Sequence, residues 1–131
     1  MTVKMSTAMR NYLATNAIAG QFGGSGIIEL RTGAQPASAN LAPSGTLLVF
    51  IPTDAGWSAA AVAGKTSLLT PTPAIATASG TAGWARLICG GVNIDGSVGM
   101  AGSGADFIVN ATTITSGLAV SVAVFSITLP M

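Results

Sequence analysis

One stretch decides the fold: TAGWARLIC-GG-VNIDGSVG at residues 81–99, followed by MAGSGA at 100–105 and DFIVN at 106–110. Its two apolar runs, separated by Gly90-Gly91, indicate a hairpin, because glycine accepts the positive φ angles that a tight turn requires. The glycine-rich link at 100–105 offers a second reversal. We therefore predict three successive antiparallel strands, a meander in the middle of a β-domain.

The segments on either side of this meander indicate further strands. Residues 27–32 alternate between two faces, whereas residues 46–51 are apolar on both and are expected to be covered twice. Residues 118–129 are long enough to bridge two sheets. Their apolar phase changes near Val124-Phe125, which is typical of a β-bulge.

A helix is predicted at residues 5–20, where Gly20 is a suitable end. Its apolar stripe is expected to pack on a sheet or on a partner and consists of Met5, Met9, Tyr12, Leu13 and Ala17. Residues 33–45 contain two prolines and indicate an exposed loop. The whole chain, 1–131, is predicted to be one mainly β domain, in which residues 26–131 form an antiparallel β-sandwich or jelly-roll of about eight strands.

Charged residues are scarce. Half of the 131 residues are hydrophobic and 7% are charged, whereas a typical soluble domain has about a quarter of its residues charged. Neighbouring subunits, a lattice or lipid must then cover the surface. Lipid is disfavoured because the longest apolar run, 118–129, is short and broken by serine and threonine, and no secretion signal is evident. A net charge of +1 with dispersed basic residues argues against nucleic acid.

Histidine is absent, which removes the commonest general base and most zinc sites. Cys89 is interpreted as a small buried hydrophobe. Residues 59–66, AAAVAGKT, imitate a phosphate-binding loop but lack its first glycine. Asp95 and Asp106 lie beside glycines, where aspartate caps turns, and they offer too few oxygens for calcium. We expect no catalytic residue, no cofactor and no metal.

Trp57 and Trp84 are the largest apolar groups and are interpreted as anchors of the core or of a subunit contact, with a sugar-stacking platform as the alternative. Arg86 shares a strand face with Trp84. It either pairs with an acid or is buried at an interface, and we favour the interface. The acids concerned are Glu29, Asp95 and Asp106.

Several motifs follow one another along the chain: MSTAMR at 5–10, Gly33-x-x-Pro36, Gly45-Thr46-Leu47-Leu48, TAGWARL at 81–87, DGSV at 95–98, Gly104-Ala105-Asp106 and Thr-Ile-Thr-x-Gly at 113–117. With this order the chain resembles the small virion structural proteins of tailed bacteriophages over nearly its whole length. The resemblance implies a compact β-domain, often a jelly-roll trimer, seated where capsid hexamers and pentamers meet. Cys89-Gly90-Gly91 departs from the longer polar hairpin expected there.

The expected function is therefore that of a capsid decoration or cement protein, made in the host cytoplasm and located on the virion surface. Its partners would be itself, as a homotrimer, and the major capsid protein. The expected interface residues are Met5, Met9, Tyr12, Leu13, Leu47, Val49, Ile51, Trp57, Trp84 and Arg86. The alternative is a tail or fibre component that binds a host-surface glycan through Trp57 or Trp84. An enzyme is the third hypothesis, without a credible set of catalytic groups.

Overall fold

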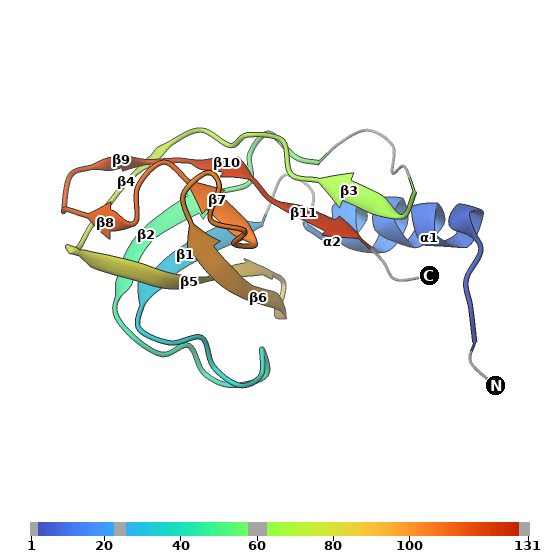
Figure 1. Cartoon of the computed structure of the whole chain (residues 1–131), viewed down its shortest axis with the longest axis horizontal. Coiled ribbons are helices and arrows are strands. Elements are labelled where there is room, and N and C mark those ends of the chain that lie inside the picture. The colour runs from blue at the N-terminus through green and yellow to red at the C-terminus, as the bar shows by residue number, and fades with distance from the viewer. Residues whose placement is uncertain (1–2, 23–25, 58–62, 129–131) are drawn as a thin grey trace.

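The computed structural model describes residues 3–22, 26–57 and 63–128. The chain is mainly β with a short N-terminal helical region, as the sequence predicts (Figure 1). The helical region consists of α1 (Thr7–Leu13), the π-helix η1 (Ala14–Ala19) and α2 (Gly20–Phe22). The strands are β1 (Ile27–Thr32), β2 (Leu47–Pro52), β3 (Lys65–Ser67), β4 (Ala74–Ile75), β5 (Gly80–Cys89), β6 (Val92–Gly99), β7 (Phe107–Val109), β8 (Thr113–Ile114), β9 (Ala119–Val120), β10 (Val122–Val124) and β11 (Ser126–Thr128).

The main sheet is organised around β5. Its strand order is β10-β7-β6-β5-β1-β2, and β8 pairs with the first residues of β5. The predicted hairpin of β5 and β6 is confirmed, with Gly90 and Gly91 at φ angles of 58° and 84°. These positive values explain why two glycines occupy the turn.

The third strand of the predicted meander has the opposite direction, because β7 runs parallel to β6. The link between them doubles back, with Gly102 and Gly104 at positive φ. Asp106 fixes the return: its carboxylate accepts hydrogen bonds from the backbone N–H of Ser97 at 2.9 Å and from its hydroxyl at 3.0 Å. The sheet is therefore curled and mixed, and the antiparallel sandwich or jelly-roll stays a prediction.

The C-terminal segment does bridge separate sheets, but as three short strands. β9 pairs with β4, β10 pairs with β7 in the main sheet, and β11 pairs with β3 beside the helices (Figure 1). The register irregularity lies between Val122 and Val124, and Phe125 then turns into the core. Leu129, the predicted end of this strand, lies outside the described residues.

The helices, β3 and β11 form a helical lobe beside the sheet lobe, which comprises the other strands and their loops (Figure 1). The helical region runs through Gly20, which has a helical φ of −67°, to Phe22, so the predicted end at Gly20 is wrong. Three aromatic contacts join the two lobes. Phe22 lies 6.4 Å from Trp57 between ring centroids, Trp57 lies 5.9 Å from Phe125, and Phe125 stacks on Phe107 at 4.0 Å.

Candidate functional site

A row of polar side chains crosses the outer face of the main sheet. Residues directly opposite one another in paired strands project from the same face. The register places Glu29 of β1 opposite Arg86 of β5, and Arg86 opposite Asp95 of β6. Phe50 of β2 extends this row at the edge of the sheet.

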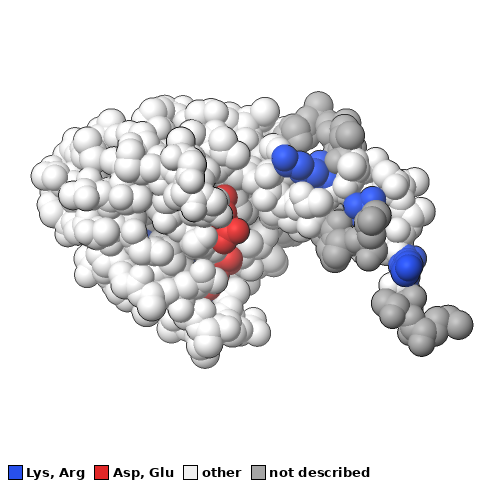
Figure 2. All heavy atoms as spheres, viewed as in Figure 1, with Lys and Arg blue, Asp and Glu red and all other residues white. Residues whose placement is uncertain are grey.

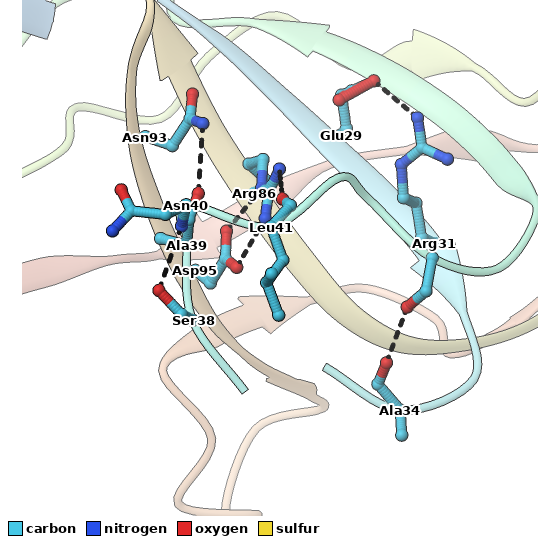
Figure 3. Close-up of polar contacts among 11 residues, drawn as sticks. Glu29, Arg31, Ala34, Ser38, Ala39, Asn40, Leu41, Arg86, Asn93 and Asp95 are labelled. Carbon is cyan, nitrogen blue, oxygen red and sulfur yellow. Dashed lines mark hydrogen bonds and ion pairs between the residues drawn. The ribbon is translucent and has the colours of Figure 1, made fainter. Parts of the chain in front are cut away.

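Arg86 and Asp95 form a buried, two-pronged ion pair (Figure 3). Nε of Arg86 donates to Oδ1 of Asp95 at 2.6 Å and Nη2 donates to Oδ2 at 2.8 Å, and both side chains are 3% exposed. Nη1 donates to the carbonyl of Leu41 at 3.0 Å, and the guanidinium lies 5.3 Å from the centre of the Trp84 ring. The hydrogen bond to Asp95 raises the pKa of Arg86 more than burial lowers it, so the guanidinium stays charged.

Residues 33–45 fold back over this polar row and will be called the strap. They are largely exposed, as predicted, but hydrogen bonds from Arg86 and Asn93 hold the middle of the strap on the sheet (Figure 3). The carbonyl of Ala39 accepts from the side-chain amide of Asn93, and the carbonyl of Gly45 accepts from Arg31 at 3.4 Å. Arg31 also pairs with Glu29 at 3.1 Å. The ion pairs therefore position a loop, which is a structural role.

A shallow pocket of about 400 Å³ opens between the strap and the β5–β6 turn, lined by Ala39, Asn40, Gly91, Val92 and Asn93. Its polar groups are neutral carboxamides and backbone. Such a lining offers hydrogen bonds to a ligand but no group that transfers a proton near neutral pH.

The groups considered for catalysis are engaged elsewhere. Asp95 is held by Arg86, Asp106 caps the return to β7, and Cys89 is half-buried against the core. Within the described ranges, no three metal-binding side chains gather. Of the stretch that imitates a phosphate loop, residues 59–62 lie outside the described residues, while Gly64 and Lys65 lead into β3.

The structure divides the predicted interface residues into three groups. Five are buried inside the chain: Val49, Ile51, Trp57, Trp84 and Arg86. Met5, Leu13 and Leu47 are half-buried, and Met9 and Tyr12 are exposed. The assignment of these five to an interface is thus corrected: Val49, Ile51 and Trp57 pack in the core, whereas Trp84 and Arg86 are buried on the strap side of β5. For Trp84 and Arg86 the physical reason is that β5 has the core on one face and the strap on the other, which sequence spacing does not show.

The same burial removes the proposed sugar platform, because neither indole offers a face to a glycan. Strand β2 is not covered twice along its length: Leu48 is buried, whereas Phe50 is exposed. Sequence analysis missed Phe50 as a surface residue. The alternation in β1 carried a signal, because Glu29, which lies opposite Phe50, marks a face that is not purely apolar.

All nine charged residues lie in the described part of the chain. Two ion pairs take up Glu29, Arg31, Arg86 and Asp95, and Arg10 is buried in the helical lobe. Four charged side chains are left exposed: Lys4, Lys65, Asp54 and Asp106. In Figure 2 the blue surface lies mainly over the helical lobe and the red surface over the sheet lobe.

No family model, no curated protein and no solved structure matches the chain. Among the described residues, no helix is long and apolar enough to cross a membrane. The resemblance to phage virion proteins therefore depends on the sequence motifs alone.

Proposed function

We propose that this chain is a non-enzymatic structural protein of a tailed-phage virion, which decorates and cements the capsid. One observation carries the proposal: four charged side chains are exposed on a surface of 6699 Å². Eleven large apolar side chains in the described part are exposed on the same surface. A small domain that works alone needs far more interspersed charge to stay dispersed, so this surface suits a protein that is covered by neighbours.

A cement protein stabilises a capsid by binding to the expanded shell in preference to its precursor. Copies that associate with one another, as a trimer, and with major capsid subunits lower the free energy of the expanded shell relative to its precursor. The antiparallel jelly-roll arrangement belongs to this proposal as well. Met9 and Tyr12 on the helix and Phe50 on β2 are among the exposed side chains available for such contacts. Of the other predicted contact residues, Met5, Leu13 and Leu47 are half-buried and five are buried.

The test is stoichiometry on particles. Purified chain is added to expanded shells that lack it, and bound copies are counted by quantitative mass spectrometry. A cement protein saturates at on the order of hundreds of copies per shell and raises the temperature at which the shell opens. Saturation at about six or twelve copies would assign the chain to a tail ring, and no binding to any particle would overturn the proposal.

A further inference from the structure

The helix buries one charged residue and leaves two large apolar side chains exposed. A helix on a soluble domain turns its apolar stripe to the core and its charges to water. Here Arg10 points inward, where Nη1 donates to the carbonyl of Ala63 at 3.0 Å. Asn11 adds a second link, because its side-chain oxygen accepts from Gly64 N–H at 2.6 Å. The outward side carries Met9, 47% exposed, and Tyr12, 63% exposed.

This outward stripe will be called the helix stripe: Met9 and Tyr12, with Lys4 exposed just before the helix. The predicted apolar stripe was expected to pack on a sheet or a partner. The helical region packs on the rest of the chain through Arg10, Ala14 and Phe22, which leaves Met9 and Tyr12 uncovered on its outer side. Exposed aromatic and thioether side chains of this kind are typical of interface cores.

A second apolar surface lies on the edge strand β2 of the main sheet. Ile27 of β1 lies opposite Pro52 of β2. Phe50 precedes Pro52 by two residues, so its side chain projects from the same face of the sheet. Ile27 is 40% exposed and Phe50 is 49% exposed, and Asp54 is exposed just beyond the strand. Ile27, Phe50 and Pro52, with Asp54 at the end, will be called the β2 ledge.

Charge separates the two surfaces. The helical lobe contains only cations, Lys4, Arg10 and Lys65, whereas the sheet lobe has two internal ion pairs and the unpaired acids Asp54 and Asp106. Three positive and two negative charges give the net +1 of the whole chain. Two helix stripes facing each other would bring cation against cation, while a helix stripe on a β2 ledge brings Lys4 toward Asp54.

We propose that the helix stripe of one copy docks on the β2 ledge of the next copy, head to tail. This inference deepens the proposed function, on which its claim of self-association rests. A head-to-tail contact joins unlike surfaces, so every copy in a closed ring uses both of its surfaces once. The ring then presents its other faces to a shell.

The test blocks each surface separately. Tyr12→Asp disables only the helix stripe and Phe50→Asp disables only the β2 ledge, and both side chains are exposed enough for the variants to fold, which circular dichroism checks. By sedimentation velocity, wild type forms a closed oligomer and each variant alone is a monomer. An equimolar mixture gives a one-to-one dimer, because each variant supplies the surface that the other lacks. Met100→Asp, at a site equally exposed at 49% but three strands away from β2 in the sheet, oligomerises like wild type.

Two results overturn the inference. Phe50→Asp that oligomerises like wild type shows that the ledge is not used, and a mixture that stays monomeric shows that the two surfaces do not meet. Charge reversal gives an independent check: Lys4→Glu and Asp54→Lys each weaken association by about fivefold at low salt, and the double variant recovers it. Failure of recovery contradicts the pairing of these two ends.

The proposed function fails differently. A wild-type monomer that still saturates shells overturns the head-to-tail contact and leaves the cement role standing. A ring that binds no shell overturns the cement role and leaves the head-to-tail contact standing.

Discussion

Replacing Asp95 by asparagine tests whether the buried ion pair holds the strap. The carboxylate accepts from two nitrogens of Arg86 at 2.6 and 2.8 Å, and both side chains are almost fully buried. Asparagine has the same shape but no charge and one acceptor oxygen, so one of the two charge-assisted bonds is lost and Arg86 is left as an uncompensated buried charge. Breaking a buried pair in this way costs about 3–5 kcal/mol. We expect about 3 kcal/mol for Asp95→Asn, since one bond survives.

The matched control is Glu29→Gln. This acid accepts a hydrogen bond from Nη2 of Arg31 at 3.1 Å, and the side chains of Arg31 and Glu29 are 15% and 8% exposed. The expected loss is about 1 kcal/mol. In the double variant Arg86→Met with Asp95→Leu no charge is buried, so its free energy of unfolding returns to within about 2 kcal/mol of wild type.

Urea denaturation followed by tryptophan fluorescence measures these differences, because Trp84 lies beside Arg86. A loss of 3 kcal/mol moves the midpoint by about 1.5 M if the denaturant slope is about 2 kcal/mol per molar. The hydrogen bond raises the pKa of Arg86. Its stabilisation is therefore fully present below the unfolded pKa and lost only at strongly alkaline pH, so the loss must be equal at pH 6 and pH 9. Equal effects of Asp95→Asn and Glu29→Gln, or a double variant as unstable as Asp95→Asn, would refute the reasoning.

Three further changes test other contacts. Gly45 and Gly56 both have φ of +76°, but a Cβ on Gly45 would overlap the carbonyl of Thr32, while one on Gly56 meets open space. We therefore expect the free energy of unfolding, measured by urea denaturation, to fall by more than about 3 kcal/mol for Gly45→Ala and by about 1 kcal/mol for Gly56→Ala. Equal losses would contradict the overlap. Phe125→Ala removes the ring between Trp57 and Phe107 and should cost about 3–4 kcal/mol, whereas Val124→Ala at the exposed neighbouring position should change stability by less than about 0.5 kcal/mol. Hydrogen bonds from Thr72 lower the pKa of Asp54. This carboxylate therefore stabilises the fold above its unfolded pKa of 3.8 and ceases to do so as pH falls through the lower folded value. In thermal melts, Asp54→Asn should lose less stability than wild type between pH 7 and pH 3.

Local features of the chain were predictable and long-range ones were not. The β5–β6 hairpin depends on Gly90-Gly91 and its flanking residues, so the sequence predicts it correctly. The parallel direction of β7 depends on the contact between Ser97 and Asp106 across a link of glycines, which no periodicity records. The presence of the helix follows from its period, but its orientation depends on Ala63, 53 residues beyond Arg10.

The buried ion pair was within reach of the sequence. Arg86 lies four residues before Gly90-Gly91 and Asp95 lies four residues after it, and a two-residue turn makes such positions cross-strand partners. Applying the hairpin register to the charged residues would have selected Asp95 from the three candidate acids. The burial of Arg86 inside the chain was beyond reach, because it depends on the strap arriving from residues 33–45.

The placement of the charges bears on why the surface is so apolar. Five of the nine ionic side chains are used inside the fold: four form the two ion pairs, and the fifth, Arg10, is buried. Stability alone does not require buried pairs, because apolar residues of similar volume often stabilise a core as well. What a pair supplies here is direction: the third donor of Arg86 selects the carbonyl of Leu41 and fixes the position of the strap. A domain that must remain dispersed by itself would keep these charges in water, so their use inside the fold is consistent with a surface that neighbouring subunits, not solvent, cover.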